Sequence, residues 1–256
     1  MTPLYLIDEY SEFPPSHFAL DEPEGLIAVS NSVTALLVWR AYHQGYYPCS
    51  PIGEELNLWW APAERMVLIP QDLHISKNFN KLLKRIIRDE NKANAAIQVT
   101  INRCFENVIR ACAEVPRRQD FDGSWISEEI IAAYSELHKQ GHAHSFETWQ
   151  DGELVGGLYG VRVGQIFCGE SMFSAQSQAS RIAFSHAVNF LAAQGIKLID
   201  CQQDSNYLRS LGAKLIPRSD YELYLYQLAH QALVNETWPT SRISFSGQYI
   251  VEHCND

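Results

Sequence analysis

Apolar residues recur along the chain at two different spacings, which predict helices and strands respectively. Between residues 102 and 114, apolar side chains such as Phe105, Val108 and Cys112 follow one another at three to four positions, the spacing of an amphipathic helix. Thr34 and Ser127 are suitable N-caps for two further helices. The helices expected in this way cover residues 34–45, 76–89, 102–114, 127–141, 178–194 and 206–211.

Short apolar runs bounded by turn residues predict the strands. The dipeptide Asp151-Gly152 is a strong two-residue hairpin signal, and Gly164 separates the following pair of runs. Residues 144–169 are therefore expected to form an antiparallel meander of three strands. The full set of expected strands is 58–60, 66–69, 96–99, 144–150, 154–163, 165–169, 197–201 and 221–227.

The order of these elements predicts an α+β protein in three parts. Prolines punctuate residues 1–72, which we expect to form a small N-terminal α/β domain. Residues 73–228 form a second domain with a mostly antiparallel sheet. Its helix pair, three-strand meander, helix and further strand resemble the core of N-acetyltransferase-like folds. Residues 229–256 have no strong periodicity and are expected to be an appended C-terminal tail.

Composition excludes several classes of protein. The chain has 256 residues, of which 46% are hydrophobic, enough for one large core or two modest ones. No run of about 18 apolar residues is available to cross a membrane, and the acidic N-terminus lacks a secretory signal. The six cysteines form no C-x-x-C pair, so a reduced, cytoplasmic protein is expected. The net charge of −10 argues against a general nucleic-acid binder.

One basic cluster stands apart from this acidic background. Five basic residues within 12 positions fall on one face of the expected helix 76–89. They are Lys77, Lys81, Lys84, Arg85 and Arg88. In an acidic protein, such a cluster alone is more typical of a solvated helix face than of a phosphate-binding one.

Polar residues inside apolar strands mark a candidate site. Glu170 follows an apolar strand, and Asp200 and Gln202 alternate with apolar residues in the strand that ends near residue 201. Strict alternation would place Asp200 and Gln202 on one sheet face and Cys201 on the other, which makes Cys201 a poor nucleophile. Two such strands favour a polar site at a sheet edge. The pair His142-x-His144 lacks a third ligand nearby, so it predicts a structural pair rather than a metal site.

Many motifs between residues 13 and 228 occur together in one known family. They are Phe13-Pro14-Pro15, Ala41-Tyr42-x-x-Gly45, Leu58-Trp59-Trp60, Leu73-His74-Ile75-Ser76, Ser124-Trp125-Ile126, Ala133-Tyr134-x-x-Leu137-His138, Gly141-x-Ala143-His144-Ser145, Leu154-Val155-Gly156-Gly157-Leu158-Tyr159-Gly160-Val161, Gly169-Glu170-Ser171-Met172-Phe173-Ser174, Leu198-Ile199-Asp200-Cys201-Gln202 and Ser210-Leu211-Gly212-Ala213. In these motifs the chain resembles the leucyl/phenylalanyl-tRNA–protein transferases. The resemblance implies a small N-terminal domain on an N-acetyltransferase-like domain, in agreement with the order of elements.

The resemblance also implies a reaction. The family transfers Leu, Phe or Met from aminoacyl-tRNA to proteins that begin with Arg or Lys, and the product is recognised for degradation. The resemblance assigns Asp200 and Gln202 to orient or deprotonate the accepting amine, as a base or as a hydrogen-bond relay. It assigns Glu170 to hold this network or to contact the cationic acceptor. A monomer without a cofactor is expected.

Further residues gain a role only through the resemblance. The donor side chain would enter an apolar pocket formed by Leu158, Phe167, Met172, Phe184, Leu191 and Ile199. The basic helix would grip the tRNA acceptor stem through Lys77, Lys81, Lys84, Arg85 and Arg88, where contacts to phosphate are sequence-independent and sensitive to salt. Trp125 would be the platform for the terminal adenine.

The chain departs from the family pattern in two places. Val29-Ser30-Asn31-Ser32 replaces the usual Gly-Gly-Asp-Leu, and Tyr47-Pro48-Cys49 replaces Phe-Pro-Trp, which removes one expected stacking wall for the adenosine. We expect retained transfer with altered tRNA binding. Two alternatives stay open: a catalytically weakened tRNA-binding paralogue, and an acyltransferase that uses another acyl donor.

Overall fold

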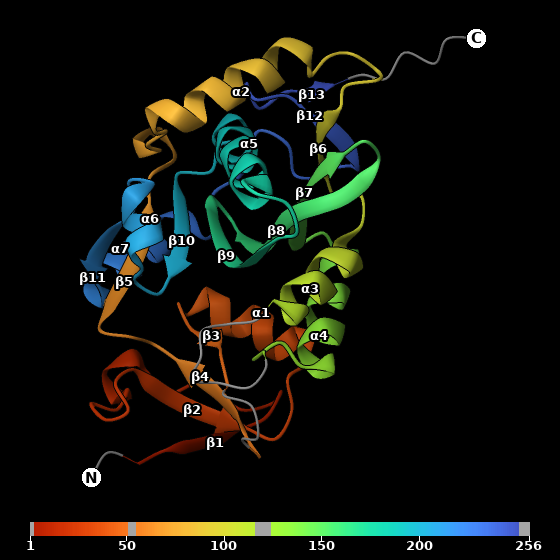
Figure 1. Ribbon diagram of the computed structural model, residues 1–256. Helices are drawn as coiled ribbons and strands as arrows, with labels where there is room; N and C mark the ends of the chain where they lie inside the picture. Colours follow the sequence, from red (N-terminus) through yellow and green to blue (C-terminus); the bar gives the residue numbers. More distant parts are fainter. Residues whose placement is uncertain (1–2, 51–54, 116–123, 251–256) are drawn as a thin grey trace.

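The computed structural model describes residues 3–50, 55–115 and 124–250, and it contains two β-sheets (Figure 1). The smaller sheet has the strand order β1-β2-β4-β3. Its strands are β1 (Tyr5–Ile7), β2 (Leu26–Ser30), β3 (Tyr47–Pro48) and β4 (Asn57–Trp60). Strand β2 is buried along its whole length, because it lies in the middle of this sheet and beneath the first helix.

The larger sheet has nine strands in the order β11-β5-β10-β9-β8-β7-β6-β12-β13. Their bounds are β5 (Glu64–Leu68), β6 (Ile97–Ile101), β7 (Ala143–Gln150), β8 (Glu153–Val163), β9 (Ile166–Ser174), β10 (Leu198–Gln202), β11 (Lys214–Pro217), β12 (Ser241–Ile243) and β13 (Tyr249–Ile250). Every neighbouring pair is antiparallel except β9 and β10, which run parallel. Strand β10 pairs with the first part of β9, so it ends beside the middle of β9.

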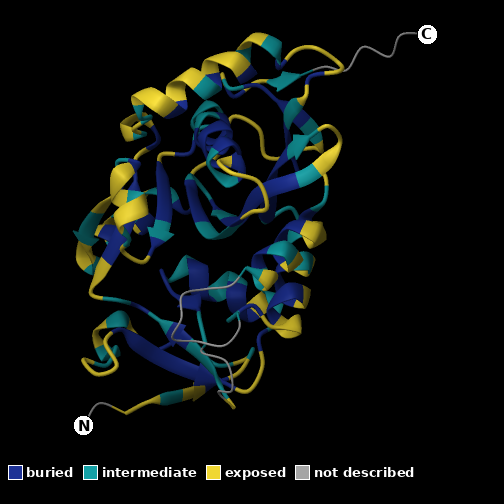
Figure 2. Ribbon diagram, viewed as in Figure 1, coloured by how far each residue is buried: buried dark blue, intermediate teal, exposed yellow. Residues whose placement is uncertain are grey.

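Helices cover both faces of this sheet (Figures 1 and 2). The seven helices within the described residues are α1 (Ala35–His43), α2 (Lys77–Asp89), α3 (Phe105–Glu114), α4 (Glu128–Lys139), α5 (Ala179–Ala193), α6 (Asn206–Ser210) and α7 (Arg218–Leu228). Two 3₁₀ turns lie at Ser16–Phe18 and Pro70–Asp72. Helices α2 and α5 share one hydrophobic core with the sheet, whereas α1, α3, α4 and α7 share the other. Helix α5 is the crossover between β9 and β10.

The predicted α+β class with a mostly antiparallel sheet is confirmed. The meander at 144–169 is present as β7, β8 and β9, and the helix pair before it and the helix and strand after it follow in the expected order. Thr34 and Ser127 are N-caps as predicted, since their side chains accept from the main-chain N–H groups of Leu37 and Ile130. No helix within the described residues is both long and apolar enough to span a bilayer.

Three expectations differ from the structure. The strand predicted at 221–227 is wrong, because Arg218–Leu228 is a helix. Strand β5 lies before the expected boundary at residue 72 but pairs with β10 and β11 in the large sheet. Within the expected tail, β12 and β13 extend the far edge of the same sheet beside β6. No disulfide joins the described cysteines, and Cys254 lies outside the described residues.

Candidate active site

A cavity of about 500 Å³ lies where β10 ends beside the middle of β9. The expectation that Glu170 follows the end of its strand is wrong, because β9 continues to Ser174. The apolar wall of the cavity comes from β9 and β10, from β8 and from helix α5. All six residues predicted to form an apolar pocket line it: Leu158, Phe167, Met172, Phe184, Leu191 and Ile199. Five of them are buried and Met172 is half-buried, so the side chains close the bottom of the cavity rather than its mouth.

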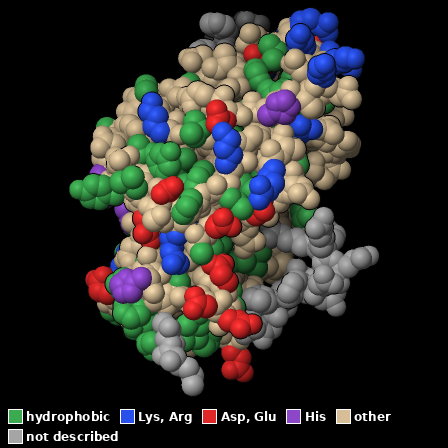
Figure 3. Space-filling view, turned by 90° about the vertical axis from the view of Figure 1, so that its left-hand side faces the viewer, with side chains coloured by type: hydrophobic (Ala, Val, Ile, Leu, Met, Phe, Trp, Pro, Cys, Tyr) green, Lys and Arg blue, Asp and Glu red, His purple; other side chains and the backbone are tan. Residues whose placement is uncertain are grey.

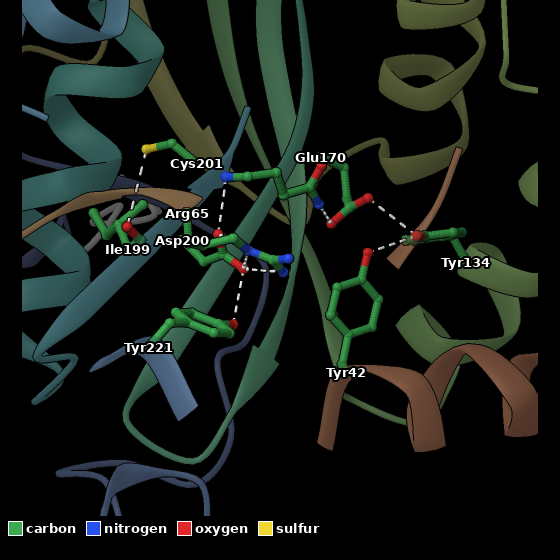
Figure 4. A network of polar contacts seen from close by, with 9 residues as sticks. Tyr42, Arg65, Tyr134, Glu170, Ile199, Asp200, Cys201 and Tyr221 are labelled. Atoms are coloured by element: carbon green, nitrogen blue, oxygen red, sulfur yellow. Dashed lines mark hydrogen bonds and ion pairs between the residues drawn. The ribbon is translucent and has the colours of Figure 1, made fainter. Parts of the chain in front are cut away.

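The polar side of the cavity is built around Glu170 (Figure 4). The Nε2 group of Gln202 donates to Oε1 of Glu170 over 2.8 Å. The hydroxyl of Tyr134 donates to the other carboxylate oxygen over 3.0 Å, and the hydroxyls of Tyr134 and Tyr42 lie 2.8 Å apart. Glu170 thus joins β9, β10, α4 and α1 through a single carboxylate.

The surroundings of Glu170 make its carboxylate a weak acid. Burial raises the pKa of Glu170 from 4.5 to about 7, against the lowering effect of hydrogen bonds from Tyr42, Tyr134 and Gln202. This carboxyl group therefore takes up a proton at a higher pH than an ordinary glutamate does. A carboxyl group with a pKa near the working pH is suited to accept and release a proton.

Asp200 does not reach the cavity. Its side chain is fully buried, and it is not among the residues that line the cavity wall. Arg65 holds the carboxylate through two nitrogens at 2.9 and 2.8 Å, and the hydroxyl of Tyr221 donates to it over 2.9 Å. The carboxylate also accepts the main-chain N–H of Gln202 over 2.8 Å. Asp200 therefore lies behind Gln202, where it contacts protein groups.

The expectation that Asp200 and Gln202 share one face by strict alternation is wrong. The pairing of β10 with β5 shifts register between these two residues, and Gln202 has a φ of 61°. This bulge turns the side chain of Gln202 into the cavity wall, where Cys201 also lies. Burial raises the pKa of Cys201 well above its usual range, so its thiol stays protonated and is a poor nucleophile, as predicted.

Trp125 and Cys49 both line this same cavity. The predicted adenine platform and the cysteine that replaces the family's tryptophan are thus parts of one wall. Cys49 is half-buried, and its main-chain carbonyl accepts the indole N–H of Trp60 over 2.6 Å.

The predicted basic helix is α2, whose apolar side packs into the core through Phe79, Leu83 and Ile86. The five basic side chains all lie on its exposed side: Lys77, Lys81, Lys84, Arg85 and Arg88. Figure 3 shows Lys and Arg side chains gathered at the upper end of the molecule, the level at which α2 lies in Figure 1, with acidic side chains below. On this face of the molecule, the upper end is therefore richer in basic side chains than the lower part.

No group of three potential metal ligands occurs within the described ranges. The imidazole of His142 stacks on Trp39 with ring centroids 3.9 Å apart. The ring of His144 lies 4.4 Å from that of Trp238, and its Nδ1 lies 3.1 Å from the amide nitrogen of Asn102. The two histidines therefore pack against different aromatic side chains.

Sequence reasoning missed four residues of the polar network. Tyr42 and Tyr134 lie within matched motifs, so the motifs carried a signal for them. For Arg65 there was only a weak indication in the sequence, a charged residue among the apolar residues of strand β5. For Tyr221 there was no indication, because its segment was expected to be a strand.

The family model described as "Leucyl/phenylalanyl-tRNA protein transferase" matches residues 67–226, which include Glu170, Asp200 and Gln202. The chain belongs to this family.

Curated leucyl/phenylalanyl-tRNA–protein transferases are similar to the chain over nearly their whole length. The protein of Nitrosospira multiformis is 46% identical over 228 residues, which are 89% of this chain and 93% of that protein. The protein of Laribacter hongkongensis is 41% identical over 251 residues, covering 98% and 97% of the two chains. Among solved structures, FemX is similar with a TM-score of 0.42 and 10% identity, covering 77% of this chain and 74% of that one.

Proposed function

We propose that this protein transfers Leu, Phe or Met from aminoacyl-tRNA to the N-terminal amine of proteins that begin with Arg or Lys, and so marks them for degradation. The observation that carries the proposal is a single cavity with an apolar wall and the Glu170–Gln202 pair on its polar side. The same cavity can thus bind the donor side chain at its apolar wall and the accepting amine at its polar side. Membership of the transferase family supports the same reaction.

The apolar wall suits the proposed donors. Its six predicted residues carry no charge, and Met172 adds a flexible thioether. A pocket of this kind separates apolar side chains only modestly, since one methylene contributes about 1–3 kcal/mol. Leu, Phe and Met are therefore accepted together, whereas a charged side chain would have to shed its water without a partner.

The transfer itself requires little activation. The aminoacyl ester is already reactive, so the protein has to hold the amine beside the ester carbonyl. The amine nitrogen forms a bond to that carbonyl carbon, the bond to the ribose oxygen breaks, and the ribose oxygen takes up the proton that the nitrogen loses. The products are a peptide bond and a tRNA with a free terminal hydroxyl.

We propose that Glu170 and Gln202 handle the amine. An α-ammonium group has a pKa of about 7.7–8.0, close to the value of about 7 for Glu170, so a proton passes between them at small cost. The amide oxygen of Gln202 is an acceptor for the amine N–H, while its Nε2 group bonds Glu170. Asp200 acts behind Gln202 rather than on the amine.

The tRNA would bind across two surfaces. The exposed basic residues of α2 bind the phosphates of the acceptor stem. Trp125, at the cavity wall, stacks on the terminal adenine. All of these groups come from one chain, so we expect a monomer to suffice. Because charged tRNA is made in the cytoplasm, we place the reaction there.

Transfer of labelled Leu from Leu-tRNA to a peptide that begins with Arg tests this proposal. We expect labelled peptide at low salt, where tRNA binding is strongest. The same peptide with an acetylated N-terminus is the control and should stay unlabelled. Binding of tRNA without labelling would support a catalytically weakened paralogue, and labelling only from an acyl-CoA would support the other acyl donor; either result would overturn the proposal.

A further inference from the structure

Arg65 is a buried charged residue that no step of the proposed reaction uses. It lies on β5 with only 2% of its surface exposed, and its guanidinium is held between the rings of Tyr47 and Tyr221, each 4.6 Å from the ring centroid. Its Nε and Nη2 groups form a fork on the carboxylate of Asp200 at 2.9 and 2.8 Å. The planar guanidinium fits this two-point contact, which a lysine cannot reproduce.

The carboxylate that Arg65 holds is also the group that fixes the main chain of Gln202. The Oδ1 atom of Asp200 accepts both the Nε group of Arg65 and the N–H of Gln202, the latter over 2.8 Å. Gln202 has a φ of 61°, a conformation that non-glycine residues adopt at a cost. The surroundings must therefore hold Gln202 in this conformation. The hydrogen bond from its main-chain N–H to Asp200 does so.

This conformation decides where the Gln202 side chain points. At the register shift in β10, the bulge brings Gln202 to the cavity wall, and its amide then reaches Oε1 of Glu170. A change at Arg65 would let the Asp200 carboxylate move. Since Asp200 and the N–H of Gln202 are bonded to each other, the amide of Gln202 would move with it.

We propose that Arg65 is a positioning residue for aminoacyl transfer: through Asp200 it holds Gln202 in the conformation that presents its amide to Glu170 and the incoming amine. Tyr221 supports the same carboxylate from the other side. The inference rests on the proposed function, because it deepens the role of the same site. A purely stabilising role would not need this ion pair, since apolar replacements of buried ion pairs are often neutral or stabilising.

Steady-state kinetics of Arg65→Lys test the proposal. Lysine keeps the positive charge but loses the fork, so we expect kcat to fall about tenfold or more, while KM for tRNA and for peptide stays within about twofold. Arg242→Lys is the matched control: Arg242 is also buried, at 5% exposure, and donates to the main-chain carbonyls of Glu90 and Lys92 away from the cavity. This control should leave kcat per folded molecule unchanged.

Two further variants separate positioning from folding. Asp200→Asn keeps an oxygen that can accept from Gln202 but loses one of the two oxygens held by Arg65. We therefore expect kcat to fall about tenfold, as in Arg65→Lys, whereas loss of a general base costs about 10²–10⁴-fold. The double variant Arg65→Met with Asp200→Leu removes both buried charges together, so it should fold. It also removes the acceptor for Gln202, and its kcat should therefore fall at least as far as that of Arg65→Lys.

The outcomes distinguish this inference from the proposed function. Absence of transfer by the unaltered protein would overturn the proposed function itself. Normal transfer by the unaltered protein, together with an unchanged kcat in folded Arg65→Lys or in the folded double variant, would overturn the positioning role alone. A loss of activity that matches the unfolded fraction measured by thermal denaturation would also overturn it.

Discussion

The side-chain amide of Gln202 donates to Oε1 of Glu170 over 2.8 Å, and this contact links the end of β10 to the middle of the parallel strand β9. Both residues line the cavity that holds the apolar wall. Asp200, which lies between Arg65 and the main chain of Gln202, is buried behind them. Glu170 and Gln202 therefore line the cavity, whereas the carboxylate of Asp200 contacts protein groups behind it.

The pH dependence of transfer should follow the ionisation of Glu170. Burial raises its pKa to about 7, and only the ionised form accepts a proton, so kcat/KM should rise with pH through about 7 rather than near 4.5. Glu170→Gln cannot accept the proton, so we expect kcat/KM to fall about 10²-fold. The rise of kcat/KM with pH that remains in this variant should have the midpoint of the peptide's α-amine, about 7.7–8.0. A pH–rate profile with the same midpoint in both proteins would rule out Glu170 as its source.

The donor preference should respond to a narrower cavity. Met172 is half-buried at the cavity wall, so Met172→Trp can be accommodated while it fills space near the donor side chain. We expect kcat/KM for Phe-tRNA to fall about tenfold more than for Leu-tRNA, since overfilling an apolar pocket costs roughly 1–3 kcal/mol. Binding of uncharged tRNA serves as the control and should not change. Equal losses for both donors would place the donor side chain elsewhere.

The exposed basic face of α2 should set the affinity for tRNA. Reversing two charges, Lys81→Glu with Lys84→Glu, is expected to raise KM for tRNA several-fold and to reduce the slope of log affinity against log salt by about two. The value of kcat at saturating tRNA should be unchanged. Lys139→Glu with Lys197→Glu, which reverses two lysines that are also exposed but lie outside α2, is the matched control. If this control weakened tRNA binding equally, the effect would come from net charge alone.

Much of the fold could be predicted because its strands and helices keep regular apolar spacing. The meander from β7 to β9 followed from such patterns, whereas the six apolar residues of the cavity wall followed only from the resemblance to the family. Helix α7 was not predicted, because Tyr221, Leu223 and Leu225 recur at every second position, as in a strand. In the helix, Tyr221 and Leu225 are buried at a spacing of four, whereas Leu223 is 56% exposed.

The residues that hold Gln202 and Asp200 in place were harder to predict than the residues that line the cavity. Strict alternation along β10 fails at Gln202, because a bulge and a positive φ are set by tertiary contacts and leave no local pattern. Arg65 is 135 positions away from Asp200 in the chain, so no spacing could join them. The partners of a buried carboxylate depend on topology, which the order of elements only partly fixes.

Restoring the missing aromatic residue should strengthen binding of the tRNA end. Cys49 lines the cavity together with Trp125, and Cys49→Trp would supply a second ring for the terminal adenine. Stacking contributes about 1–3 kcal/mol per base, so we expect KM for charged tRNA to fall by roughly 5- to 100-fold. Cys49→Ala is the control and should bring no gain. Weaker binding by the tryptophan variant would mean that the cavity wall at Cys49 does not face the adenosine.

Single-turnover transfer of Phe from Phe-tRNA to a peptide that begins with Arg most directly tests whether the chemistry takes place at the Glu170–Gln202 pair. We expect the unaltered protein to attach Phe to the peptide's α-amine, and Gln202→Ala to do so about 10²-fold more slowly with unchanged affinity for tRNA. No attached Phe with the unaltered protein, or the same rate in both proteins, would contradict the mechanism.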